Sequence, residues 1–339
     1  MADLELFSTC PSWIRGADPR AHLLWVRDAA RWSEAAGCTG MLVYTDNSQP
    51  DPWVIAQALV HATATICPLV AVQPMYMHPY STAKLVSTFG HLFGRRIYLN
   101  MVAGGFTNDL KALSDGTGHD RRYDRLIEYT EIVQRLLASC TPLTYEGEFY
   151  QTFNLRIDPP LPPELAPGVF VSGSSAAGQA AARALGARAI RYPKPPAEET
   201  ETVGDGLECG IRVGILARET DDEAWTIAQT RFPADRKGEL AHQLAMKVSD
   251  SQWHRQLSDR EQAAAGDVYW LGPFERYQTM CPYLVGSYGS VAQEVARYLD
   301  RGYRTFILDI PADAQDLPHS QRVFDEARTL APSLSASHA

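Results

Sequence analysis

The sequence contains few of the patterns that would assign a chemistry directly. Its six cysteines are scattered along 339 residues, with no CxxC pair and no histidine at metal-ligand spacing. This distribution predicts free thiols in a reducing compartment. The sequence also has no HExxH motif and no GxSxG turn around a serine nucleophile. We therefore expect neither a metal site nor a nucleophile of these kinds.

Positive charge and long apolar runs are scarce as well. The chain has 31 Lys and Arg against 40 Asp and Glu, a net charge of −9, and no long basic run. This balance argues against nucleic acid and anionic membrane surfaces as partners. No apolar run approaches the roughly 20 residues that span a bilayer, and residues 1–5 lack the pattern of a signal peptide. We expect a cytoplasmic protein.

Short apolar runs alternate with helix-like segments over most of the chain. The runs that predict strands are 4–8, 40–44, 66–72, 97–102, 168–171, 189–192, 210–217 and 305–310. The segments that predict helices are 22–36, 52–63, 81–93, 123–139 and 176–185. Strands separated by helices of this length indicate a parallel sheet, and about eight of them favour an α/β fold of the (β/α)8 TIM-barrel type. An open doubly wound sheet is the alternative, but no strand is followed by a GxGxxG turn.

Several segments exceed a minimal barrel. Residues 158–167 hold five prolines and cannot form a helix or a central strand. Residues 193–206 read as an exposed connector, and residues 234–265 as a charged, helix-prone insertion. We expect one barrel domain over residues 1–332 and a disordered tail over residues 333–339.

The most informative stretch is a turn between a predicted strand and an alanine-rich helix. Ser172, Gly173, Ser174 and Ser175 follow the apolar residues 170–171. The N-terminus of a helix presents unpaired N–H groups and the positive end of the helix dipole, and serine hydroxyls add further donors. The turn can therefore hold a phosphate without a cationic side chain. The alternative is an ordinary serine N-cap.

Other polar residues lie at the predicted strand ends, where the active site of such a barrel is expected. Gln73 and Asn100 carry amides, which suit the edge of a neutral heterocycle, although Asn100 could also satisfy local backbone groups. Arg212 stands in an apolar run and must either meet a carboxylate or face a polar cavity; its alternate position in the strand favours the cavity. Tyr123 either reaches a bound phosphate or belongs to a solvated helix start. Trp53 reads as a pocket wall or as core.

The order of these motifs resembles the bacterial luciferase-like flavin monooxygenases, and within them most closely the alkanesulfonate monooxygenase group. The likeness covers about residues 4–330. The motifs that carry it are 40–45, 69–74, 100–104, 119–123, 172–175, 209–212, 218–225 and 284–287. Each motif is weak alone, and their order and spacing carry the resemblance.

The resemblance implies a two-component monooxygenase that receives FMN as FMNH2 from a separate NAD(P)H:flavin reductase. Such enzymes use O2 as co-substrate and oxygenate a small organic molecule through a flavin C4a-peroxide or hydroperoxide. A homodimer is expected, and a role in secondary metabolism would suit the site. Two alternatives remain open: an F420-dependent oxidoreductase on the same fold, and a non-catalytic flavin-binding paralogue.

By position, the resemblance assigns each candidate residue a role. The turn 172–175 and Tyr123 would hold the FMN phosphate. The residues that would line the isoalloxazine are Thr45, Gln73 and Asn100. The assignment names Arg212, Arg276 and Cys10 as catalytic, with Arg276 on a loop that closes over the site, and Trp53, Tyr192 and Arg212 as substrate-binding.

Departures from the relatives argue against a simple alkanesulfonate as substrate. Gly214 and Ile310 replace a histidine and a tyrosine that face the sulfonate in the relatives. The other replacements are Cys10 for a histidine, Gln49 for a cysteine and Tyr192 for a tryptophan. A sulfonate would lose hydrogen bonds worth roughly 1.5–3 kcal/mol each to charged donors. We therefore expect a different organic substrate.

Overall fold

Eight parallel strands close into a barrel in the computed structural model, which describes residues 4–196, 198, 206–248 and 267–337. In order around the ring these strands are β1 (Glu5–Thr9), β2 (Gly40–Val43), β3 (Cys67–Val72), β4 (Tyr98–Val102), β7 (Val169–Ser172), β8 (Arg188–Arg191), β9 (Cys209–Arg218) and β12 (Thr305–Leu308). Each strand pairs with the next, and β12 pairs with β1. The predicted (β/α)8 barrel is confirmed, and the open sheet is not formed.

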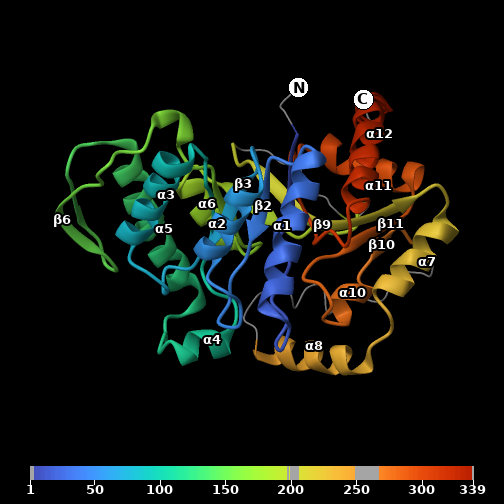
Figure 1. The fold of residues 1–339 in the computed structure, drawn as a ribbon, viewed down its shortest axis with the longest axis horizontal. Helices are drawn as coiled ribbons and strands as arrows, with labels where there is room; N and C mark the ends of the chain where they lie inside the picture. Colours follow the sequence, from blue (N-terminus) through green and yellow to red (C-terminus); the bar gives the residue numbers. More distant parts are fainter. Residues whose placement is uncertain (1–3, 197, 199–205, 249–266, 338–339) are drawn as a thin grey trace.

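Helices surround the barrel (Figure 1). Their bounds are α1 (Pro19–Ala35), α2 (Pro52–Ala62), α3 (Pro79–Phe93), α5 (His119–Ala138), α6 (Ala176–Ala184), α7 (Asp221–Arg231), α11 (Tyr288–Asp300) and α12 (Asp316–Ser337). Asp18, Asp51 and His78 cap the first three, each followed by a proline in the first turn. These caps explain why α1 and α3 begin before residues 22 and 81.

The insertions are short elements added at the ends of the barrel connections. They are α4 (Thr107–Ala112), β5 (Leu143–Glu146), β6 (Gln151–Leu155), the 3-10 turn η1 (Pro163–Leu165), α8 (Arg236–Val248), β10 (Tyr269–Trp270), α10 (Gly272–Glu275) and β11 (Tyr283–Ser287). The expected insertion 234–265 is described only as far as α8, and residues 249–266 lie outside the described residues. Likewise, residues 197 and 199–205 of the predicted connector are not among them.

Two elements extend beyond the sequence-based boundaries. Strand β9 is ten residues long because its first half pairs with β8 and β12, while its second half pairs with β11. Helix α12 is described to Ser337, past the domain boundary predicted at residue 332. The domain boundary itself stays a prediction. Within the described part of the chain, no helix is both long enough and apolar enough to cross a membrane.

Side chains that point into the barrel change from apolar to polar toward the carboxyl ends of the strands. Inside the ring, a cluster of buried side chains includes Phe7, Phe170 and Ile307. Residues in register on neighbouring parallel strands point to the same face. Arg212 is in register with Ile307, and Asn100 with Phe170, so both point into the barrel. The polar residues that follow therefore gather at one end of the barrel.

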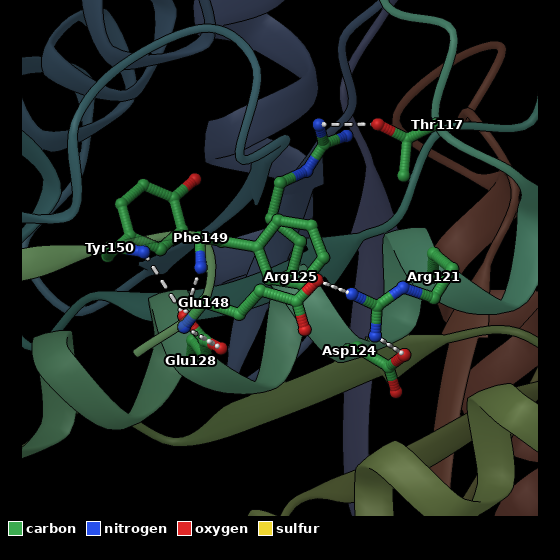
Figure 2. Close-up of polar contacts among 8 residues, drawn as sticks. All are labelled: Thr117, Arg121, Asp124, Arg125, Glu128, Glu148, Phe149 and Tyr150. Carbon is green, nitrogen blue, oxygen red and sulfur yellow. Dashed lines mark hydrogen bonds and ion pairs between the residues drawn. The ribbon is translucent and has the colours of Figure 1, made fainter. Parts of the chain in front are cut away.

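Helix α5, which carries Tyr123, is held by contacts with the β5–β6 hairpin and with the loop before the helix. Figure 2 shows the β5–β6 turn seated on Glu128, whose carboxylate accepts hydrogen bonds from the N–H groups of Glu148, Phe149 and Tyr150 at 2.9, 2.8 and 3.1 Å. The turn itself offers these three N–H groups no acceptor, and the Glu128 carboxylate satisfies them. The hairpin is thereby held against the helix that positions Tyr123.

A buried ion pair holds the loop before α5. Arg125 donates to both carboxylate oxygens of Asp115, at 2.6 and 3.3 Å, and the two side chains are 9% and 3% exposed. Burial alone raises the pKa of Asp115, but the hydrogen bonds from Arg125 and Thr117 outweigh it and lower the pKa from 3.8 to about 2. The pair therefore stabilises the folded chain while Asp115 is ionised.

We expect Asp115→Asn to lower the free energy of unfolding at pH 7 by about 3 kcal/mol, because it leaves a buried guanidinium without its anion. The folded-state pKa of Asp115 lies below the unfolded value, so the contribution is complete above about pH 4 and is lost as the pH falls toward 2. Urea unfolding of wild type and variant at several pH values checks this. A difference between them that stays constant from pH 7 to 3 would contradict the assignment.

Candidate active site

The turn between β7 and α6 is shaped for a small anionic group. Ser172 ends β7, and Ser175 is the N-cap of α6, where its Oγ accepts a hydrogen bond from the N–H of Gly178 at 3.1 Å. A Cβ atom at Gly173 would clash with the hydroxyl of Tyr123. Glycine at this position therefore lets the tyrosine hydroxyl lie directly against the turn. The structure brings Tyr123 and the serine turn together.

The hydroxyl of Ser174 completes this turn. Its Oγ atom is buried and has no hydrogen-bond partner among the described residues. A buried polar atom without a partner is costly unless a ligand or a water satisfies it. Ser174, the Tyr123 hydroxyl and the N–H groups of the first turn of α6 form a set of donors at the positive end of the helix dipole. These residues fit the phosphate of the FMN that the resemblance implies.

Amide side chains lie at the neighbouring strand ends, and hydrogen bonds fix their orientation. Ser172 Oγ donates to Asn100 Oδ1 at 2.7 Å, so the described partner of Asn100 is a side chain rather than the backbone. Gln73 Nε2 donates to the hydroxyl of Tyr76 at 3.3 Å, and that hydroxyl donates to Asn47 Oδ1 at 2.9 Å. Both amides are thus held at the carboxyl end of the barrel.

A cavity of about 300 Å³ opens beside Gln73. The loop after β2, the first turn of α2 and the end of β3 line it, and Thr45 and Trp53 belong to this lining. Trp53 is only 5% exposed and also packs near Phe89, so it serves as a cavity wall and as part of the core. The structure therefore brings Thr45, Gln73 and Trp53 together, and their roles stay predictions.

Arg212 faces a carboxylate inside the barrel. Its Nη2 lies 3.9 Å from Oδ1 of Asp309, the residue that follows β12, and the two side chains are 10% and 9% exposed. Oδ2 of Asp309 accepts hydrogen bonds from Thr279 Oγ1 at 2.5 Å and from the Tyr283 hydroxyl at 2.8 Å. Arg212 thus points to the barrel interior and lies near a carboxylate there, as one alternative expected; that it faces a polar cavity stays a prediction.

Burial shapes the ionisation of the groups around Arg212. It works against the charged form of Arg212, but the surrounding groups, with Asp309 among them, raise the pKa of Arg212 above its ordinary value. Burial raises the pKa of Tyr192, and the positive charge of Arg212 offsets part of that rise. Burial and then the Asp309 carboxylate raise the pKa of Tyr283 well above its usual value. The tyrosines therefore stay neutral donors, and Tyr192 lies beside Arg212 as expected.

Two residues assigned as catalytic have other surroundings. Arg276 lies at the end of α10, donates to the carbonyl oxygen of Phe232 at 2.7 Å and stacks over Trp270. Cys10 is 3% exposed and packs in the core between sheet and helices, where burial raises the pKa of its thiol. The structure does not bring these two residues into the polar groups described above. Their catalytic roles stay predictions, and the burial of Cys10 gives its role no support.

Asp309 is the principal residue that sequence reasoning missed. It follows the last barrel strand by one position and continues the alternation that turns Ile307 into the barrel. That alternation, applied one residue past the apolar run, is the signal that could have found it. Tyr76, whose hydroxyl accepts a hydrogen bond from Gln73, also belongs to the cavity lining.

Comparison with known proteins gives a family match over most of the chain. The profile of the family described as "Luciferase-like monooxygenase" matches residues 12–305. The chain is 33% identical over 303 residues to the 4-(gamma-L-glutamylamino)butanoyl-[BtrI acyl-carrier protein] monooxygenase BtrO of Niallia circulans, covering 87% of this chain and 88% of that protein.

Solved structures share the fold at lower identity. The EDTA monooxygenase EmoA from Chelativorans sp. BNC1 aligns with a TM-score of 0.71 at 17% identity, over 96% of this chain and 94% of that chain. An F420-dependent secondary alcohol dehydrogenase aligns with a TM-score of 0.64 at 15% identity, over 96% and 99%. The fold is therefore shared by proteins of different chemistry.

Proposed function

This chain belongs to the luciferase-like monooxygenase family and is a flavin-dependent monooxygenase, and from this premise we propose that it is a two-component enzyme that uses FMNH2 and O2 to oxygenate a small organic substrate. One oxygen atom enters the substrate and the other leaves as water, while FMNH2 is oxidised to FMN. The observation that carries the proposal is the donor set of the β7–α6 turn, in which the buried Ser174 Oγ has no hydrogen-bond partner among the described residues.

In this proposal the chain binds and orients, and the bound flavin supplies the electrons for oxygen transfer. Ser174 and Tyr123 donate to the phosphate, with the N–H groups of α6. Thr45, Gln73 and Asn100 hold the edge of the isoalloxazine by hydrogen bonds. The other side chains act on the substrate and on water: Trp53 and Tyr192 wall the pocket against water, and Arg212 donates to a substrate oxygen.

We propose that the substrate is an acyl group carried as a thioester on an acyl-carrier protein. Support comes from BtrO, whose name gives a carrier-bound acyl chain as its substrate and which is 33% identical over most of both chains. The replacements at Gly214 and Ile310 agree with a substrate other than a simple alkanesulfonate. Under this proposal, the resemblance to the alkanesulfonate monooxygenase group does not predict the substrate.

The proposal includes partners and location. A separate NAD(P)H:flavin reductase supplies the FMNH2, because the resemblance implies a two-component system. We also propose a homodimer in the cytoplasm.

The test is turnover under labelled O2 with a flavin reductase, NADPH, FMN and a panel of acyl groups, each offered on a carrier protein and as the free acid. Product that gains one heavy oxygen only on the carrier supports the proposal, and product from the free acid alone would move the substrate to the soluble class. Oxidation with F420 and without label incorporation would establish the oxidoreductase alternative. Flavin binding with no product from any substrate would favour the non-catalytic paralogue.

A further inference from the structure

The surroundings of Arg212 include a carboxylate for which the proposed reaction has no use. We propose that Asp309 cancels the charge of Arg212, so that this part of the site takes a neutral oxygen acceptor, an amide, ester or thioester carbonyl, and rejects anions. The inference deepens the proposed function by naming the chemical class of the group that Arg212 binds, and it rests on that function for the identity of this pocket as the substrate site.

The pair with Asp309 does not use up the hydrogen-bond donors of Arg212. Nη2 lies 3.9 Å from Asp309, beyond hydrogen-bond distance, and the buried Nε of Arg212 has no partner among the described residues. The structural pair of Arg125 and Asp115 differs, because there the guanidinium donates to both carboxylate oxygens. Arg212 is hydrogen-bonded to Tyr192 and still keeps its Nε–H for a further acceptor, while its charge is already balanced.

Asp309 cannot turn to close this pair. Thr279 and Tyr283 both donate to its Oδ2, which fixes the carboxylate and leaves Oδ1 facing Arg212. The ring of Tyr283 occupies the space where a side chain at residue 214 would lie, since a Cβ atom at Gly214 would clash with it. Glycine at residue 214 is thus the reason that Tyr283 reaches Asp309. Three positions cooperate to hold one negative charge in place.

The fixed negative charge decides which ligands can approach. An anion within reach of Arg212 would also lie close to Asp309, in surroundings where both side chains are about nine-tenths buried and water screens little. A neutral carbonyl meets no such repulsion and still accepts from the guanidinium. Three other titratable groups lie beside Arg212, namely Tyr44, Tyr192 and Cys281. Each stays neutral because burial raises its pKa. These three groups therefore do not change the net charge beside Arg212.

The test compares hexanamide with hexanesulfonate, a neutral and an anionic probe of similar length, by calorimetry on the full chain. Wild type is expected to bind hexanamide at least about tenfold more tightly than hexanesulfonate. Asp309→Asn should raise the affinity for hexanesulfonate by at least about tenfold and change that for hexanamide by less than about threefold. Tyr283→Phe keeps the carboxylate and should give no such gain.

A double variant, Asp309→Asn with Arg212→Met, locates the bound anion and should lose the gain. The proposal is overturned if wild type prefers hexanesulfonate or does not bind hexanamide, if Asp309→Asn gains no affinity for the anion, or if the gain survives in the double variant. The wild-type preference decides alone if Asp309→Asn fails to fold. Titration of the same proteins with FMNH2 is separate: the predicted preference without flavin binding would sink the proposed function and leave the neutral pocket standing.

Discussion

Replacing Ser174 with aspartate should weaken the binding of FMNH2 by at least about a hundredfold. Unit charges about 4 Å apart repel by about 4 kcal/mol near a protein surface, which exceeds the roughly 2.7 kcal/mol that a hundredfold change requires. Ser174→Ala removes only one hydrogen bond to the phosphate and should weaken binding about tenfold. Anaerobic titration followed by the flavin spectrum measures both dissociation constants.

The matched control for this charge is Ser139→Asp. Ser139 is exposed and follows the far end of α5, so it gains the same charge away from the serine turn. The dissociation constant of FMNH2 from Ser139→Asp should equal that from wild type. If Ser174→Asp binds FMNH2 as tightly as this control, the phosphate does not lie at the β7–α6 turn.

Arg212→Ala should lower kcat/KM by at least about a hundredfold while the dissociation constant of FMNH2 stays within about threefold of wild type. In the proposed role of Arg212, the variant loses a charged donor to the substrate oxygen, and it leaves the buried Asp309 without its cation. Steady-state kinetics at saturating FMNH2, together with the anaerobic titration, separates the two effects.

Arg322→Ala serves as the control, because Arg322 pairs with Glu219 and Glu326 on the exposed face of α12. It should leave both constants unchanged. A variant of Arg212 that loses flavin affinity and retains turnover would move Arg212 into the cofactor site. A loss of folded protein, seen as a lowered Tm, would call for Arg212→Met, which keeps most of the side-chain volume.

The barrel could be predicted from the sequence because its strands are short apolar runs, five of which are followed by a helical pattern. The predicted boundaries are wrong where a residue outside the periodic pattern starts the element, as Asp18 does for α1. The β5–β6 hairpin was missed because its alternation is broken at Asn154, which has a positive φ. Strand β11 was missed because it exists by pairing with the second half of β9, a contact between distant segments that no local pattern reports.

The candidate site divides in the same way. Gln73, Asn100 and the turn 172–175 could be found because a parallel barrel brings all carboxyl ends of its strands to one face. Tyr123 was expected to reach a phosphate, both from its own segment and from the family resemblance, but its packing against Gly173 could not be predicted because the two residues lie on different elements. The role of Asp309 could not be predicted because its three partners lie on β9, on β11 and in the loop before β11, and only the folded chain brings them together.

Anaerobic titration of wild type with FMNH2, repeated with reduced F420 as competitor, tests the central claim most directly. We predict saturable binding of FMNH2 that F420 does not displace and that Ser174→Asp weakens by at least about a hundredfold. Binding of F420 with no affinity for FMNH2 would contradict it and assign the barrel to hydride transfer.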